Sequence, residues 1–204
     1  MRARRGSWNR PSKAQLAFAR TRSDAKIAQF HQGDATTLPF PESRFDAAVM
    51  ALVIFFVPDP AKGVAEMVRV VAPGGTVAAY AWDIVGGGAP QQPIWAEMHT
   101  MDVKHTLPPS VEAARMDTLR DLWINAGLEA VETREITVLR TFADFDDFWT
   151  TNRTTPGLDS VIAAMTSDDA ERLKARVRER LPADANGRIT YAARANAVKG
   201  RLPY

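Results

Sequence analysis

The longest apolar stretch in the chain does not alternate as a half-exposed strand would. From Phe45 to Val57 it reads FDAAVMALVIFFV, which is the pattern of a strand covered on both faces. Pro58 and Pro60 end it, because proline cannot donate to a sheet and restricts the residue before it. The pattern predicts a buried strand that breaks off at Val57.

A helix and a second buried strand follow this break. One apolar stripe at i, i+3, i+4 and i+7 is formed by Val64, Met67, Val68 and Val71. Pro73-Gly74-Gly75 is a typical helix end, and the next apolar run extends from Gly75 to Trp82. The order strand, helix, strand predicts a right-handed crossover between parallel strands.

Weaker patterns predict the remaining elements. An aromatic stripe at helical spacing comprises Phe142, Phe145, Phe148 and Trp149. Gly86 to Pro109 is expected to be a long loop of the kind that often covers a site. The other predictions are helices at 12–22, 94–102, 116–126 and 166–181, a strand at 26–32, and a strand or hairpin at 128–142.

Composition and charge narrow the function. The absence of cysteine excludes a thiolate nucleophile and a cysteine metal site. Seven basic residues precede the first acid, Asp24, and without them 19 basic residues face 24 acidic ones, a net charge of −5. The basic character therefore belongs to the N-terminal segment, and we expect no nucleic-acid partner.

The basic N-terminal segment and the length of the apolar runs bear on the cellular location of the protein. The run from Ala47 to Val57 has 11 residues, too few to cross a bilayer, so we expect a cytoplasmic protein with no membrane partner. Gly6 and Pro11 argue against a transit peptide. Residues 1–10 are expected to form a disordered basic tail.

Three motifs occur in an informative order. They are GDATTLPFPESRFDAAVM at 33–50, DPAKGVAEMVRVVAPGG at 59–75 and AGLEAVETREITV at 126–138. Together they resemble the class I, Rossmann-like S-adenosylmethionine-dependent methyltransferases, specifically the small-molecule type 11 group. The resemblance implies an α/β fold with a mostly parallel sheet and flanking helices. It implies a methyltransferase core at 11–142 and a helical and strand extension of the same domain at 143–204.

The resemblance also implies a chemistry and a site. The family transfers the methyl group of S-adenosylmethionine to a small-molecule acceptor by in-line displacement, so catalysis is mainly alignment. Asp34 would accept from the adenine amino group and the Ala35 N–H would donate to a ring nitrogen. Ala51 and Leu52 would line the methionine part, and Phe56, beside Phe55, would flank the methyl group. Two simpler interpretations remain open: an Asx turn for Asp34 and core packing for the two phenylalanines.

No general base or metal site follows from the sequence. His31, His99 and His105 are the candidate bases, and none is singled out. Glu97, His99, Asp102 and His105 do not form an HExxH pattern, so we expect no metal.

The chain departs from the family at its start. It contains no GxGxG-type turn, and Arg10-Pro11-Ser12 stands where the family reads acid-Pro-Ser. We therefore expect the family's first two strands to be absent, as in a gene fragment. The two flanking strands would then pair directly, or the sheet would keep an open edge. Losing three contacts removes about 5 kcal/mol, so cofactor binding would be weakened or lost.

A second hypothesis comes from a different functional class. The chain could be a noncatalytic methyltransferase-like module that binds a partner through the aromatic stripe and the altered N-terminus. The acceptor and the oligomeric state are not predicted.

Overall fold

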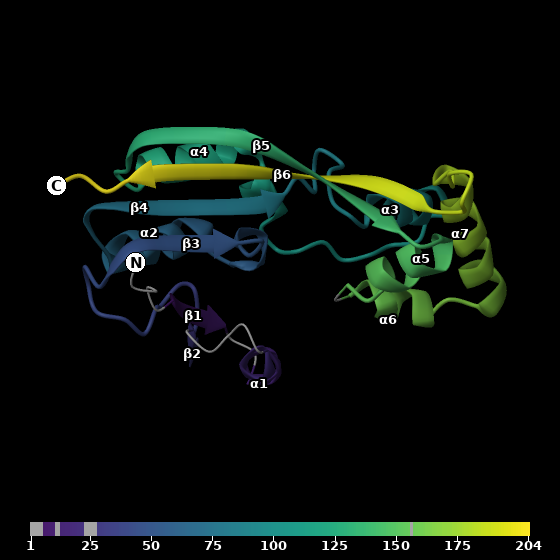
Figure 1. Cartoon of the computed structure of the whole chain (residues 1–204), viewed down its shortest axis with the longest axis horizontal. Helices are drawn as coiled ribbons and strands as arrows, with labels where there is room; N and C mark the ends of the chain where they lie inside the picture. Colours follow the sequence, from purple (N-terminus) through teal and green to yellow (C-terminus); the bar gives the residue numbers. More distant parts are fainter. Residues whose placement is uncertain (1–5, 11–12, 23–27, 156) are drawn as a thin grey trace.

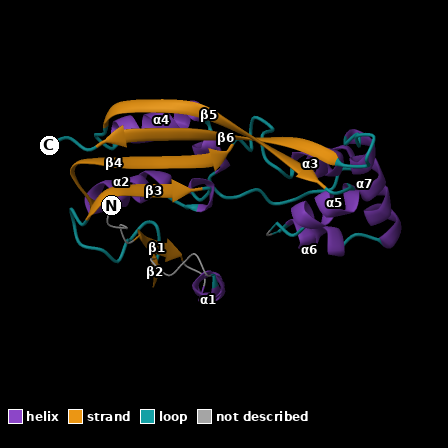
Figure 2. Cartoon of the chain, in the orientation of Figure 1, coloured by secondary structure: helices purple, strands orange, loops and turns teal. Residues whose placement is uncertain are grey.

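The computed structural model describes residues 6–10, 13–22, 28–155 and 157–204 (Figure 1). A small parallel pair is formed by β1 (Gly6–Arg10) and β2 (Ala28–Gln32), with helix α1 (Lys13–Thr21) between them in the chain. The main sheet has four strands in the order β3-β4-β6-β5. Helices cover one of its faces, and the other carries no described helix (Figure 2).

The central crossover forms as the sequence predicts, but with different limits: the strand ends at Ala51 rather than Val57 and the helix ends at Val70, before Pro73. The strand is only partly buried rather than covered on both faces, because it lies at the edge of the sheet. β3 (Phe45–Ala51) and β4 (Val71–Trp82) are parallel neighbours, joined by the 3-10 turn η2 (Ile54–Phe56) and helix α2 (Pro60–Val70). The apolar stripe of α2 is buried against these strands. Asp59 caps the helix by accepting from the Lys62 N–H at 3.0 Å.

The main sheet is mixed rather than mostly parallel. β5 (Glu129–Phe142) and β6 (Ile189–Arg201) are antiparallel, and β6 is also antiparallel to β4. Only residues 195–201 of β6 pair with β4. Residues 189–194 pair with β5 alone, so the two strands leave the sheet as a ribbon that leads to a helical lobe (Figure 1).

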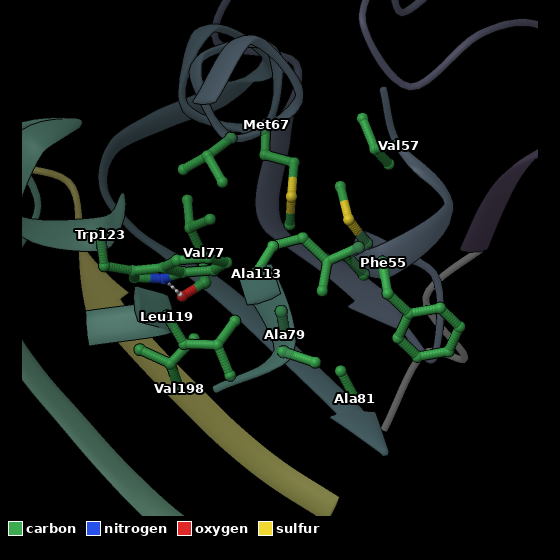
Figure 3. Packing of buried hydrophobic residues seen from close by; sticks show 14 of the residues in the cluster. Phe55, Val57, Met67, Val77, Ala79, Ala81, Ala113, Leu119, Trp123 and Val198 are labelled. Atoms are coloured by element: carbon green, nitrogen blue, oxygen red, sulfur yellow. Dashed lines mark hydrogen bonds between the residues drawn. The ribbon is translucent and has the colours of Figure 1, made fainter. Parts of the chain in front are cut away.

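The larger core lies between the sheet and two helices, α2 and α4 (Met116–Asn125) (Figure 3). The 3-10 turn η3 (Val111–Ala114) precedes α4 and is partly buried in this core. Trp123 of α4 is fully buried, and its indole N–H donates to the Val77 carbonyl at 2.9 Å. This bond satisfies the one polar group of the tryptophan and fixes α4 on the sheet.

A second core holds the helical lobe together. It is formed by α3 (Gln92–Thr100), α5 (Phe145–Arg153), α6 (Leu158–Ala163) and α7 (Ser167–Arg180), with the end of the ribbon. The aromatic stripe from Phe142 to Trp149 is buried here, at 7% exposure or less. The idea that this stripe binds a partner is therefore wrong; burial of its large apolar area against α3 and α7 is the physical reason.

The N-terminal segment also differs from the prediction. Residues 6–10 form β1, so a disordered tail is wrong for this part, and residues 1–5 lie outside the described part. β1 ends at Arg10, so the strand before the acid-Pro-Ser position exists, because parallel pairing with β2 gives its backbone groups partners.

The structure also decides how the sheet is completed beside β3. β2 pairs with β1 and not with β3, so within the described residues β3 has a strand partner on one side only. Val49 of this strand is 63% exposed. The sheet therefore keeps an open edge, the second of the two arrangements considered above.

Candidate functional site

The Gly33-Asp34-Ala35 turn holds its aspartate in a defined position. The backbone N–H and the hydroxyl of Thr36 each donate to Asp34 Oδ1 at 2.7 Å. These bonds lower the pKa of Asp34, so the exposed carboxylate is ionised at neutral pH. The Asx turn considered as an alternative is thus present, and it orients the carboxylate in addition to closing the turn.

A glycine of α2 brings this turn close to the end of β3. A Cβ atom at Gly63 would lie 3.2 Å from Val57 Cγ1, 3.6 Å from Met50 Cε and 4.0 Å from the Ala35 carbonyl oxygen. Residues from three segments therefore meet at one point of the helix that has no side chain. Two of the predicted regions, the turn at 33–35 and the end of β3, are neighbours through this contact.

An ion pair on α2 anchors the Leu38-Pro39-Phe40 loop. Glu66 accepts from the Leu38 N–H at 2.7 Å, and Arg69 donates to the carbonyls of Leu38 and Phe40 at 3.0 and 2.8 Å. Arg69 Nε also lies 2.7 Å from Glu66 Oε1, and this bond lowers the pKa of Glu66. The sequence analysis missed these two residues, although their i, i+3 spacing beside the apolar stripe was a signal.

The end of β3 has an unusual backbone conformation. Leu52 has φ of 55°, in the left-handed region that costs a branched side chain energy. Its N–H donates to the Tyr80 carbonyl of β4 at 2.8 Å, and Ala51 is the partner of Tyr80 in the ladder. The backbone thus turns sharply at the carboxyl end of two parallel strands, where open α/β sheets bind ligands.

The two phenylalanines after β3 have different surroundings. Phe55 is buried, and its carbonyl accepts from the Ser110 N–H at 3.0 Å. Phe56 is 51% exposed, with its ring 4.6 Å from that of Phe55. Core packing therefore accounts for Phe55, while Phe56 remains accessible to a ligand at this edge.

The histidine candidates fall into two places: His31 lies in β2, while His99 and His105 line one pocket at the end of α3. His31 of β2 packs edge-on against Phe40, and its Nε2 is buried without a hydrogen-bond partner. His105 stacks on Trp95 of α3, and burial, followed by the charge of nearby His99, lowers its pKa.

The four residues that could be drawn as a metal set do not act together. Glu97 is bound by Arg176 and Arg180 of α7, whereas His99, Asp102 and His105 line a separate pocket. Within the described ranges, no three His, Cys, Asp or Glu side chains are placed to hold a metal ion.

The chemical groups of the Asp34 turn suit the adenine half of S-adenosylmethionine. An ionised, oriented carboxylate at Asp34 and an apolar surface at Ala35 suit an adenine ring with an amino group. The sharp turn at Leu52 presents backbone at the carboxyl edge of the sheet. The side chain of Arg10, which stands at the family's ribose position, lies outside the part described.

Comparison with known proteins bears on these motifs. Residues 10–79 match the model of a family described as a methyltransferase domain, Methyltransf_11. This segment, about a third of the chain, is thus similar to the type 11 methyltransferases. The matched segment contains the GDA turn, the LPF loop, β3 and α2, so the order of the first two motifs is confirmed. The third motif, at 126–138, lies outside the matched residues.

Curated relatives match over similar lengths. An uncharacterized protein of Mycobacterium tuberculosis is 33% identical over 76 residues, which are 37% of this chain and 28% of that protein. A demethylmenaquinone methyltransferase of Desulfitobacterium hafniense is 49% identical over 51 residues, 25% of this chain and 20% of the relative. The matches thus span less than a third of each relative's length.

The fold has wider support. The crystal structure of a candidate methyltransferase from Bacillus halodurans superposes with a TM-score of 0.59, covering 97% of this chain and 83% of that one, at 16% identity. The Rossmann-like methyltransferase fold is therefore confirmed, with a mixed sheet. No helix in the described part is long and apolar enough to cross a membrane.

Proposed function

We propose that this chain carries out S-adenosylmethionine-dependent methyl transfer to a small-molecule acceptor. One observation carries the proposal: the Asp34 turn is packed through Gly63 beside the end of β3, within a segment of the type 11 family. Asp34 and Ala35 would hold the adenine, and Ala51, Leu52 and Phe56 would line the methionine and methyl part.

Methyl transfer depends on the alignment of the acceptor with the methyl group and the sulfur more than on proton transfer. The sulfonium of the cofactor makes its methyl group electrophilic when it is bound. The contribution of this chain is to hold the adenine at Asp34 and to exclude water with Phe56. The absence of a GxGxG turn from the sequence leaves the methionine part with fewer contacts. We therefore expect weak binding, with Kd nearer millimolar than micromolar.

Calorimetric titration with S-adenosylhomocysteine tests the proposal. The wild-type chain should bind, and Asp34→Ala should raise Kd about tenfold, the loss expected for one charge-assisted hydrogen bond. Asp121→Asn, which removes an exposed acid of α4, is the matched control and should leave Kd unchanged. A folded chain that does not bind at millimolar ligand would refute the proposal.

A second candidate function retains one supporting observation. The open edge of β3, with Val49 exposed, could pair with a strand of another polypeptide, as a noncatalytic module would require. This alternative does not require the chain to methylate demethylmenaquinone, the substrate named for the Desulfitobacterium relative. Size-exclusion chromatography with light scattering tests it, because a strand partner should give a stable complex that Val49→Lys abolishes. A monomer that binds S-adenosylhomocysteine would exclude it.

A further inference from the structure

A cavity of about 590 Å³ opens beside the carboxyl end of β4. It lies between the first turn of α4, the loop after β4 and the middle of the β5–β6 ribbon. Its polar lining includes Asp83, Arg115, Arg120, Glu135, Arg194 and Asn196. Asp83 is three residues beyond Tyr80, so the cavity starts about 10 Å along β4 from the Leu52 turn, by the rise of a strand.

The face of the ribbon that lines the cavity follows from the register. Thr133 and Glu135 of β5 line it, while Arg134 between them points to the opposite face. Asn196 is the ladder partner of Glu135 and is 5% exposed. Its Nδ2 donates to the Ala114 carbonyl at 2.9 Å. The cavity therefore has a fixed polar floor.

Two of the acidic groups in the lining share one arginine. Arg194 Nη2 lies 2.7 Å from Asp83 Oδ2 and 2.7 Å from the Gly86 carbonyl oxygen, and Arg194 Nε lies 3.4 Å from Glu135 Oε2. One arginine thus ties together the end of β4, the glycine loop and the ribbon. It is held on three sides and is not available to a ligand.

The other two arginines are held loosely. Arg115 Nε lies 3.5 Å from Asp117 and 3.9 Å from Glu112, and all three side chains are well exposed. Arg120 makes no ion pair recorded among the described residues. Exposed pairs of this length are weak, so these two guanidinium groups are accessible to an anion, although the lining as a whole carries three arginines and three carboxylates.

The remaining wall is apolar. Val85, which is 42% exposed, and Met116 both line the cavity. A ligand that suits this arrangement has a single negative charge and an apolar body. A dianion such as a phosphate monoester is disfavoured, because three carboxylates also line the cavity and repel a second charge.

We propose that this cavity binds a small organic carboxylate, held by Arg120 and Arg115 with its apolar body against Val85 and Met116. If the methyl transfer proposed above is correct, on which this extension rests, the methyl acceptor is a carboxylate of this kind. The binding itself can be measured without cofactor or methyl transfer.

The probes are benzoate, its neutral analogue benzamide, and phenyl phosphate, each titrated to about 10 mM by calorimetry with the full 204-residue chain. Benzoate should bind at least about ten times more tightly than benzamide, the difference expected for a charge-assisted contact. Arg120→Gln and Arg115→Gln should each raise the Kd for benzoate about tenfold. Arg134→Gln, on the opposite face of the same ribbon, is the matched control and should not change it.

Several outcomes would overturn the proposal. They are no benzoate binding to a folded wild-type chain, equal binding of benzamide, or arginine variants that bind like Arg134→Gln. Tighter binding of phenyl phosphate would overturn the assignment of a carboxylate. Titration with S-adenosylhomocysteine in parallel separates the two proposals. Binding of S-adenosylhomocysteine without binding of benzoate refutes only the carboxylate site. Binding of benzoate without binding of S-adenosylhomocysteine refutes only the proposed methyl transfer.

Discussion

The Nε atom of Arg176 lies 2.7 Å from Oε2 of Glu97, although 79 residues separate them in the chain. Arg180 of the same helix binds the other carboxylate oxygen, and the Thr100 hydroxyl donates to Oε2 at 3.0 Å. Glu97 is 3% exposed. Burial alone would raise its pKa, but the hydrogen bonds outweigh it and lower the pKa to about 2. This carboxylate therefore joins α3 to α7 as an ion.

The low pKa predicts acid sensitivity of the helical lobe. A group with a folded pKa below its ordinary 4.5 stabilises the fold fully above that pH and loses the effect as pH falls toward 2. The contribution should be about 2 kcal/mol, allowing for the exposed arginine partners. Urea denaturation at pH 7 and pH 3 should show this loss in the wild type and a smaller pH dependence in Glu97→Gln.

Asp146 provides the control for this experiment. It also pairs with α7, through Lys174 at 2.8 Å, but its side chain is 64% exposed. Because solvent screens such pairs, Asp146→Asn should be close to neutral at pH 7. Equal effects of the two substitutions would contradict the role assigned to burial.

The stability of the fold should depend on the indole N–H group of Trp123. Trp123→Phe leaves the buried Val77 carbonyl without its donor and removes part of a fully buried ring. The free energy of unfolding should fall by about 2–3 kcal/mol. Ile124→Ala, at the neighbouring position with 47% exposure, should change it little. Chemical denaturation followed by circular dichroism measures both, and a neutral Trp123→Phe would show that α4 is held by packing area alone.

Arg69 should hold the Leu38–Phe40 loop without being needed for folding. Arg69→Met removes the donors to the two loop carbonyls but keeps an apolar stem on α2. Amide hydrogen exchange at residues 37–41 should become faster, and the Kd for S-adenosylhomocysteine should rise several-fold. Arg44→Gln, an exposed cation just after the loop, should leave both unchanged. Unaltered exchange in Arg69→Met would mean that the loop is ordered by other contacts.

The left-handed backbone at Leu52 can be tested by comparing three residues. Valine is branched at Cβ and tolerates φ near 55° least, so Leu52→Val should destabilise the fold by about 1–2 kcal/mol. Leu52→Gly relieves the strain but loses a half-buried side chain, and the two effects should nearly cancel. Thermal denaturation of both variants checks the order. A more stable Leu52→Val would mean that this turn relaxes to an extended conformation.

The outcome for the aromatic stripe shows where sequence reasoning failed. The spacing correctly predicted one helical face for Phe145, Phe148 and Trp149, whereas Phe142 ends strand β5. Spacing cannot tell which surface that face meets. The partner surface comes from α3, about 50 residues earlier, and from α7. Similarly, residues 6–10 show little strand pattern, and β1 forms because β2 offers a parallel edge.

The sequence by itself determined the elements whose signals are local. The apolar run at 45–57, its two prolines and the stripe of α2 predicted β3, the break and the helix, because periodicity and proline geometry act within a few residues. The GDA and LPF motifs, in their order, also predicted the similarity to a methyltransferase domain that residues 10–79 show. Only the tertiary structure decided which of these residues meet. Ala35, Met50 and Val57 meet at Gly63, Glu97 pairs with arginines of α7, and β3 keeps an open edge. These contacts depend on distances between segments that are far apart in the chain, and no local pattern contains those distances.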